Sequence, residues 1–185
     1  NLINQIKPFD IKFHLSERVD EVKKEGDNWI VKTNNGTMFL TPNVIIAGGV
    51  GSFEPRKFPI KECEKFENKS VLYSIKDKSI FEGKTVTIFG GGDSALDWAV
   101  ELSKNSKVNL VHRRDDFRGA KATVDKVHQL AKDGKINLFT KFQMTAIKGE
   151  KNLESIDIKS DDKEVKTLQT DYALGFFGLI MQLGP

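Results

Sequence analysis

The chain has little cysteine and no long apolar run. Its 185 residues include one cysteine, Cys63, which excludes an internal disulfide and any cysteine-rich metal site. A chain with one thiol suits a reducing compartment, so we expect a cytoplasmic protein. Cys63 stands among charged residues and is predicted to be an incidental surface thiol. No apolar run approaches the roughly 20 residues that a membrane-spanning helix needs, and we expect no membrane-embedded segment.

The sequence also lacks a basic surface pattern and the common catalytic motifs. The net charge is only +3, and lysines and acidic residues are interspersed throughout, which argues against nucleic-acid binding. There is no G-x-S-x-G nucleophile motif and no P-loop lysine. His14, His112 and His128 are scattered, and none has an acidic partner at metal-ligand spacing. We therefore predict neither a metal site nor a set of catalytic side chains.

The most informative stretch covers residues 85–118. It begins with a short apolar strand at residues 86–89, passes through three consecutive glycines, and continues as a helix over residues 94–103. A second apolar strand follows at residues 108–111. This order is typical of the opening half of a βαβ nucleotide-binding unit.

The glycines fit the G-x-G-x-x-G/A pattern of dinucleotide-binding turns. Gly90 permits the tight turn, Gly92 lets a pyrophosphate approach the backbone, and Ala95 lets helix and strand pack closely. The N–H groups at the start of the helix are expected to face the phosphates, and the Asp93 side chain is expected to cap that helix. The candidate phosphate-binding residues are Gly90, Gly91, Gly92, Asp93, Ser94 and Ala95.

Basic residues after the second strand indicate which nucleotide is bound. An NAD site has an acidic residue roughly 20 positions after the glycines, whereas this chain has His112, Arg113, Arg114 and Arg118. Guanidinium groups bind a 2′-phosphate in bidentate fashion. Only five of the 29 basic residues are arginines, and three of them fall here, so we predict NADP(H) rather than NAD(H). The alternative is a surface turn whose arginines pair with the two adjacent aspartates.

The segments GGGDSALDWA and VHRRDDFR together resemble the pyridine-nucleotide domain of thioredoxin-reductase-like flavoproteins. Thioredoxin reductases carry a redox-active C-x-x-C upstream of the glycines, about where residues 71–77 (VLYSIKD) lie here, and this segment has no cysteine. The chain is more similar to the ferredoxin(flavodoxin)–NADP⁺ reductases of the thioredoxin-reductase-like type. Those proteins have a cysteine-free segment at this point and a stretch like NVIIAGGVGSFEPRKF before it. The resemblance extends over nearly the whole chain.

This resemblance implies a flavoenzyme that transfers hydride between NADPH and FAD and passes electrons to ferredoxin or flavodoxin. The whole enzyme would be a cytoplasmic homodimer, and this chain, which looks like a fragment, would supply its NADPH half. Gly48 and Gly49 would approach FAD, with a plain turn as the alternative. Nothing before Ala47 supplies an FAD glycine motif, so the chain is expected to bind FAD weakly or not at all. The alternatives are a thioredoxin-disulfide reductase and a non-catalytic NADP(H)-binding redox sensor.

The remaining pattern predicts an α/β fold, in which a Rossmann-like parallel sheet with an inserted antiparallel meander is preceded by a β-rich part of an FAD domain. Gly178 ends the last buried strand of that sheet, where open α/β sheets bind ligands, and is either a cofactor contact or a plain turn. The predicted domains are a partial FAD-binding domain with a crossing segment (1–72), an NADP(H)-binding domain (73–178) and the start of a return to the FAD domain (179–185). The predicted strands outside the central stretch are residues 11–15, 18–24, 28–33, 37–40, 43–46, 136–140, 143–149, 153–159, 164–170 and 172–177.

Overall fold

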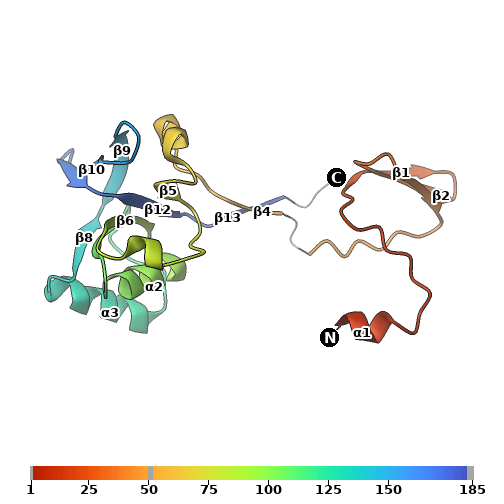
Figure 1. The fold of residues 1–185 in the computed structure, drawn as a ribbon, viewed down its shortest axis with the longest axis horizontal. Helices are drawn as coiled ribbons and strands as arrows, with labels where there is room; N and C mark the ends of the chain where they lie inside the picture. The colour runs from red at the N-terminus through yellow and green to blue at the C-terminus, as the bar shows by residue number, and fades with distance from the viewer. Residues whose placement is uncertain (1, 50–51, 183–185) are drawn as a thin grey trace. The chain divides into compact units, whose positions relative to one another are not determined.

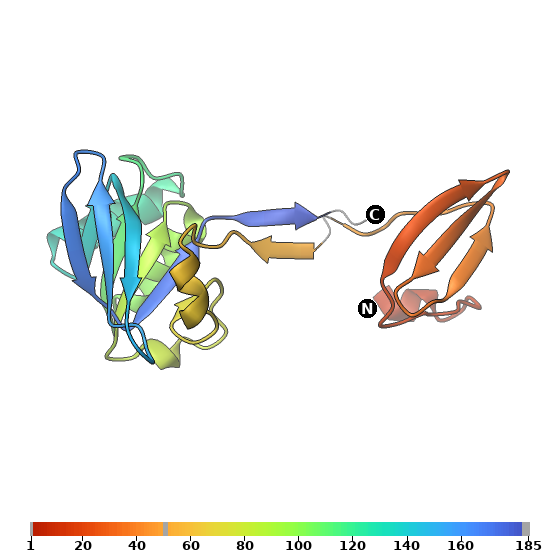
Figure 2. The same ribbon diagram turned by 90° about the horizontal axis from the view of Figure 1, so that it is seen from above.

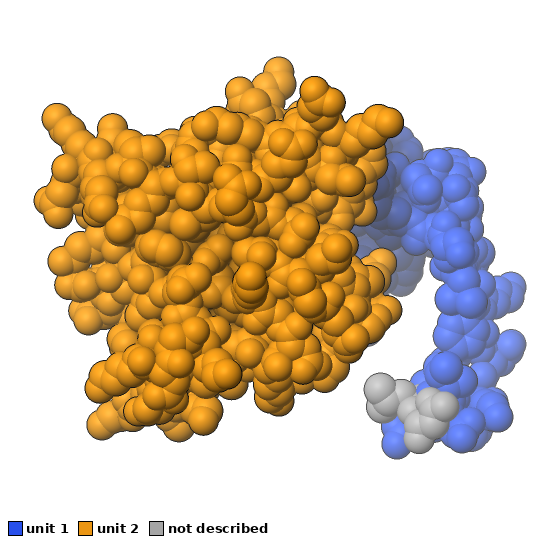
Figure 3. All heavy atoms as spheres, turned by 60° about the vertical axis from the view of Figure 1, so that its left-hand side comes forward, with its two compact units in different colours: residues 1–53, 181–185 blue, residues 54–180 orange. Residues whose placement is uncertain are grey.

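The structure, a computed structural model, describes residues 2–49 and 52–182. It contains two compact units, coloured separately in Figure 3. The first comprises residues 1–53 with 181–185, and the second comprises residues 54–180. Residues 54–72 therefore pack with the second unit. Whether the units correspond to FAD and NADP(H) domains with the predicted limits stays a prediction.

The first unit contains a short helix and a three-stranded antiparallel sheet. Helix α1 is Leu2–Ile6, and strands β1 (Val19–Glu25), β2 (Asn28–Thr33) and β3 (Met38–Thr41) lie in the order β1-β2-β3 (Figure 1). Strands β2 and β3, both predicted, pair as an antiparallel hairpin. Gly36 has a φ of +81°, and its N–H donates to the Thr33 carbonyl at 3.0 Å.

Two strands predicted for the first unit are wrong. Residues 11–15 and 43–46 form no strand in the part of the chain that the structure describes. Ile45 and Ile46, the apolar residues of the second segment, are 91% and 83% exposed. Apolar alternation produces a strand only where a neighbouring strand pairs with its backbone groups, and no described strand pairs with either segment.

The second unit is built on a five-stranded parallel sheet with the order β5-β12-β6-β7-β8. Every pair in it is parallel, as expected for strands joined by helical crossovers. Helices α2 (Asp93–Leu102) and α3 (Lys121–Lys132) connect β6 to β7 and β7 to β8. The strands are β5 (Val71–Leu72), β6 (Thr85–Gly90), β7 (Lys107–His112), β8 (Ile136–Thr140) and β12 (Tyr172–Phe176).

Helices and meander contact different residues of the sheet strands. In β6 and β7, Ile88 and Leu110 belong to the core cluster that includes the α2 residues Ala95 and Leu96. Their neighbours Phe89 and Val111 belong to the other cluster, together with residues of the meander. Successive strand residues point to opposite faces, so the helices cover one face and the meander the other. The predicted α/β architecture is confirmed.

The meander is a three-stranded antiparallel sheet with the order β11-β10-β9 (Figure 2). It enters the chain between β8 and β12, as predicted, and its inner side chains include Ile156 and Ile158, both fully buried. Burial of these apolar side chains is the main force that holds it on the parallel sheet. Its strands are β9 (Phe142–Lys148), β10 (Ser155–Ser160) and β11 (Val165–Gln169).

Cys63 is a correction to the prediction of a surface thiol. It lies in the 3-10 helix η1 (Lys61–Phe66), is only 1% exposed, and its Sγ is 3.7 Å from Met144 Sδ. A 3-10 helix repeats every three residues, so Cys63 and Phe66 share its inner face while the charged residues between them face solvent. Those charged neighbours made the thiol look exposed in the sequence.

Residues 53–81, which include the end of the predicted crossing segment, form short elements of their own. Besides η1 and β5 they contain η2 (Ser79–Phe81), and β4 (Ser52–Pro55) begins just before them. Strand β4 pairs with β13 (Leu179–Gln182) in a two-stranded sheet. The chain therefore enters the second unit beside the strand through which it leaves.

Candidate functional site

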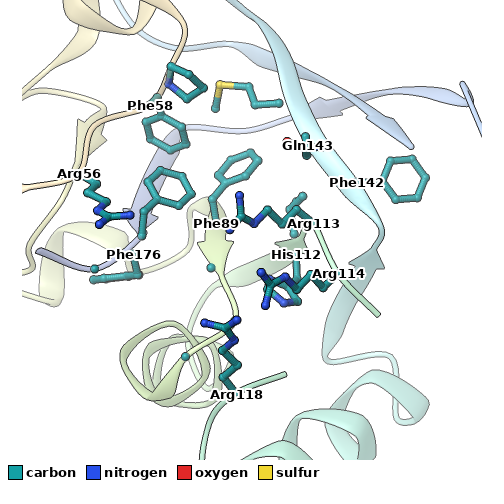
Figure 4. Close-up of a pocket in the computed structure, with 18 of the residues that line it drawn as sticks. Arg56, Phe58, Phe89, His112, Arg113, Arg114, Arg118, Phe142, Gln143 and Phe176 are labelled. Atoms are coloured by element: carbon teal, nitrogen blue, oxygen red, sulfur yellow. The ribbon is translucent and has the colours of Figure 1, made fainter. Parts of the chain in front are cut away.

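The order of the parallel strands creates a crevice at their carboxyl ends. From β6 the chain continues to β7 and β8 on one side, whereas β12 lies on the other side of β6. Open α/β sheets bind ligands where the strand order reverses in this way. A pocket of about 460 Å³ lies there, lined by the glycine turn after β6 and by the ends of β7 and β12 (Figure 4). The predicted residues in its wall are Gly90, Gly91, Gly92, His112, Arg113, Arg114, Arg118 and Gly178.

Gly90 is required by the packing of β6, α2 and β12. Its φ is +155°, and a Cβ built on it would lie 2.7 Å from the Phe176 carbonyl oxygen and 2.8 Å from the Ala95 Cβ. Both distances are shorter than any normal carbon contact, so a side chain here would push the elements apart. The predicted roles of Gly90 in the turn and of Ala95 in close packing agree with this geometry.

The next two glycines have different surroundings. A Cβ on Gly91 would lie 2.2–2.5 Å from ring atoms of His112, so this glycine makes room for the imidazole. A Cβ on Gly92 would meet nothing within 4 Å, although Gly92 lines the pocket and precedes the first residue of α2. The open space beside Gly92 can therefore receive a ligand atom close to the backbone, at the positive end of the helix.

The prediction that Asp93 caps its own helix is wrong, because its side chain makes no capping bond there. The Asp93 carboxylate accepts a hydrogen bond from the Ala120 N–H at 2.7 Å, at the start of α3. The loop approaches so closely that a Cβ on Gly119 would lie 2.6 Å from the Leu96 Cδ1 and 3.2 Å from the Asp93 Oδ1. Asp93, Ser94 and Ala95 all lie outside the wall of the pocket.

The loop after β7 folds back onto the glycine turn. The Arg118 N–H donates to the Gly91 carbonyl at 2.7 Å. The His112 ring stacks on Phe117 with ring centres 5.2 Å apart and planes 23° apart, and its Nε2 lies 3.1 Å from the Asp116 carbonyl oxygen. These contacts hold the arginine-bearing loop against the turn that would hold a pyrophosphate.

The arginines of this loop, Arg113, Arg114 and Arg118, form no ion pair with any residue that the structure describes. Asp115, their expected partner in the alternative interpretation, instead pairs with Lys141 at 2.8 Å. The three guanidinium groups therefore keep their charge and donors for a ligand in the pocket.

His112 contributes little positive charge at neutral pH. Burial lowers its pKa, and the nearby charges of the three arginines lower it further, against the bond to the Asp116 carbonyl, which raises it. The surroundings of His112 favour its neutral form, so the positive charge of the site comes from the arginines.

The far wall of the pocket is aromatic. Phe58 packs edge-on against Phe89 and Phe177, with ring centres 5.2 Å and 4.9 Å apart. The Phe58 N–H donates to the Tyr73 hydroxyl at 3.2 Å, and burial raises the pKa of that hydroxyl to about 12. This wall was not predicted, because Phe58, Phe89 and Phe177 belong to segments far apart in the sequence. The pocket thus offers a cationic surface and an apolar one.

Arg56 lines the same pocket, although no motif in the sequence predicts it there. It belongs to the segment PRKFP, which precedes the strands of the parallel sheet in the sequence. The residues around it contain no nucleotide-binding motif. The scarcity of arginine was the available signal: four of the five arginines line this one pocket.

Gly48 and Gly49 lie in the first unit and outside the pocket. Both are exposed, a Cβ on either would meet nothing within 4 Å, and Gly49 has a φ of +62°. The positive φ of Gly49 suits the alternative of a turn. Their contact with FAD stays a prediction.

The described residues contain neither a group of metal ligands nor a membrane-spanning helix. No three His, Cys, Asp or Glu side chains gather there as metal ligands would. No described helix is long and apolar enough to cross a membrane.

Known proteins resemble the chain over nearly its full length. Residues 3–183 match the family described as pyridine nucleotide-disulphide oxidoreductase. A ferredoxin–NADP reductase of Pelagibacter ubique is 66% identical over 185 residues, a match that covers 100% of this chain and 55% of that protein. The ferredoxin–NADP reductase 1 of Christiangramia forsetii is 48% identical, with 100% and 54% covered. The chain therefore spans about half the length of these curated relatives.

Solved structures share the fold. A thioredoxin reductase from Lactococcus lactis superposes with a TM-score of 0.74 at 26% identity, covering 88% of this chain and 53% of that one. A bacillithiol disulfide reductase from Staphylococcus aureus gives a TM-score of 0.77 at 20% identity, covering 96% and 53%. The second likeness concerns the fold alone.

Proposed function

The chain belongs to the pyridine nucleotide-disulphide oxidoreductase family, and we propose that it is the NADP(H)-binding part of a flavin-dependent oxidoreductase. The whole protein would transfer hydride between NADPH and FAD and exchange electrons with ferredoxin or flavodoxin. Relatives named ferredoxin–NADP reductase support this reaction. We further propose that the whole protein is a cytoplasmic homodimer.

One observation carries the choice of nucleotide. Three arginines follow β7 on the loop whose Arg118 N–H bonds to the Gly91 carbonyl of the glycine turn, and none of the three forms an ion pair within the described part of the chain. Leaving several cations unpaired side by side raises the electrostatic energy of the protein, which a bound dianion would offset. A 2′-phosphate supplies that charge, and its oxygens match the guanidinium donors.

The residues in the pocket fit NADP(H) part by part. The open side of Gly92 and the N-terminus of α2 suit the pyrophosphate. Arg113, Arg114 and Arg118 suit the 2′-phosphate. The nicotinamide would supply the hydride, and the protein's part is to bind and orient the nucleotide. Gly48 and Gly49 do not line this pocket, and we derive no step through FAD.

The family likeness to thioredoxin reductases raises a second candidate, reduction of a disulfide. That reaction needs two thiols that can exchange, and this chain has only Cys63. Burial raises the pKa of the Cys63 thiol to about 11, so almost none of it is thiolate at neutral pH. Disulfide exchange through this chain is therefore not supported.

A non-catalytic NADP(H) sensor would use the same pocket. It would differ from the oxidoreductase in lacking a flavin-binding part. The first unit, with its three-stranded sheet, has no role in a simple sensor. An FAD glycine motif elsewhere in the whole protein would support the oxidoreductase, and its absence there would favour the sensor.

Calorimetric titration of the chain with NADPH and with NADH tests the proposal. We expect NADPH to bind at least tenfold more tightly, a difference of about 1.4 kcal/mol. Equal affinities, or a preference for NADH, would contradict the assignment of the arginines to a 2′-phosphate. Binding of neither nucleotide would contradict the proposed site itself.

A further inference from the structure

The pocket contains a fourth arginine that the nucleotide motif does not include. Arg56 comes from the segment after β4, 57 positions before Arg113. In Figure 4 it lies beside Phe58 and Phe176, whereas Arg113 and Arg114 lie on the other side of Phe89. Positive charge therefore borders the pocket from two sides.

The backbone fixes Arg56 at the end of β12. Its N–H donates to the Gly178 carbonyl at 3.0 Å. Gly178 comes shortly after Phe176, the last residue of β12 that pairs with β6. Arg113 and Arg114 directly follow β7, and the glycine turn directly follows β6. Because the sheet order is β12-β6-β7, the sequence of features along the crevice is Arg56, the glycine turn and then the arginine loop.

The charge of Arg56 is available, unlike that of its neighbour. Lys57 forms an ion pair with Glu67 at 2.7 Å. No ion pair to Arg56 occurs within residues 2–49 and 52–182. Of two adjacent cations at the pocket, the guanidinium is the one left for a ligand.

The geometry points to a role for Arg56 in binding the second phosphate of the dinucleotide, the one on its nicotinamide side. This inference rests on the proposed NADP(H) site. A nucleotide with its 2′-phosphate at β7 and its pyrophosphate at β6 extends its other half over β12, where Arg56 lies.

The charges of the two groups indicate that Arg56 binds the phosphate and not the nicotinamide ring. The pyrophosphate carries two negative charges, and one helix N-terminus with about half a positive charge cannot balance both. The oxidised nicotinamide ring is itself a cation and the reduced ring is neutral, so neither attracts a guanidinium as an anion does. Arg56 would complete the neutralisation from the side opposite Arg113 and Arg114.

Calorimetry with three ligands separates this contact from the others. All three ligands carry the 2′-phosphate. NADPH has both phosphates of the pyrophosphate bridge and the nicotinamide, and 2′-phospho-ADP-ribose lacks only the nicotinamide. Adenosine 2′,5′-bisphosphate has only the first phosphate of the bridge. For Arg56→Ala we expect roughly tenfold weaker binding of the first two and less than a twofold change for the third. Arg56→Lys should lose less, because it keeps the charge without the planar donors.

The control is Lys126→Ala, which removes one positive charge from the exposed face of α3 in the same unit. It should change none of the three affinities by more than twofold. Intact bisphosphate binding by Arg56→Ala would show that the variant is folded.

Each other outcome contradicts the inference in its own way. Unchanged NADPH binding by Arg56→Ala would show that Arg56 touches no part of the nucleotide. Weaker binding of NADPH alone would assign it to the nicotinamide, and weaker binding of all three would assign it to the adenosine half. If the wild-type chain binds none of the ligands, the proposed function fails first, and this inference with it.

Discussion

The Asp93 carboxylate binds the backbone N–H of Ala120, 27 residues further along the chain, at 2.7 Å. This bond joins the first turn of α2 to the start of α3, and the bond from the Arg118 N–H to the Gly91 carbonyl runs beside it at 2.7 Å. Together they tie the glycine turn to the loop that carries the arginines. The two halves of the proposed nucleotide site are thus held in register by contacts that touch no ligand.

Replacing Asp93 by alanine tests this coupling. We expect Asp93→Ala to lower the free energy of unfolding by about 1 kcal/mol, because the Ala120 N–H loses its charged acceptor. NADPH should also bind several-fold more weakly, since the arginine loop loses one of its anchors. Chemical denaturation and calorimetry measure the two effects. Asp97→Ala is the matched control on α2: the Asp97 carboxylate accepts a long 3.4 Å bond from Thr123 Oγ1, and both quantities should barely change.

Replacing Arg113 or Arg114 by alanine tests the reading of the 2′-phosphate. Each change should weaken NADPH binding by about 1.5–3 kcal/mol, the scale of a hydrogen bond to a charged group, and leave NADH binding nearly unchanged. Parallel titrations of both nucleotides give the answer. An equal loss for NADPH and NADH would mean that the pair supports the fold and does not recognise the phosphate.

Two glycine substitutions should separate folding from binding. Gly90→Ala forces a side chain into a positive φ and against the Phe176 carbonyl, and we expect a loss of stability of about 3 kcal/mol. Gly92→Ala meets no protein atom, so it should cost about 1 kcal/mol or less through its helix-capping position. It should nevertheless weaken NADPH and NADH binding together, because its methyl group occupies the space for the pyrophosphate. Thermal denaturation and titration of both variants distinguish the two roles.

His112 should make stability depend on pH in a defined direction. Its pKa in the folded chain is lowered, chiefly by burial, so the unfolded chain binds a proton more readily. The stabilisation from neutral His112 is therefore complete above the unfolded value of roughly 6.5 and is lost as the pH falls through the folded pKa. The melting temperature of the wild type should fall more steeply between pH 7.5 and 5 than that of His112→Asn. Parallel curves for the two proteins would contradict the assignment.

The sequence was sufficient for features that depend on neighbouring residues. The strand, glycine turn and helix of residues 86–103 have a local pattern typical of a βαβ unit, and the order of elements then implies a parallel sheet. The antiparallel meander was readable for the same reason, through alternation between turns. The resemblance to thioredoxin-reductase-like flavoproteins, carried by the same residues, is confirmed by the family match and by the named relatives.

Features that depend on distant residues were not readable. Asp93 has a helix-capping residue type, but its partner is Ala120, and nothing near Asp93 in the sequence identifies that N–H. Cys63 looked exposed because its chain neighbours are charged, whereas its contact is Met144, 81 residues away. Arg56 reaches the pocket only because β12 is placed beside β6. In each case tertiary packing decided the outcome and local preference did not.

The position of β12 has a consequence for synthesis on the ribosome. This strand lies in the interior of the parallel sheet, between β5 and β6, yet it is the last strand of that sheet to be translated. While residues 91–171 emerge, one side of β6 has unpaired backbone groups and an apolar surface that only residues 172–176 can cover. Because the sheet closes late, a nascent chain that stalls within the meander has an open strand edge, and such edges are sites at which other chains can pair.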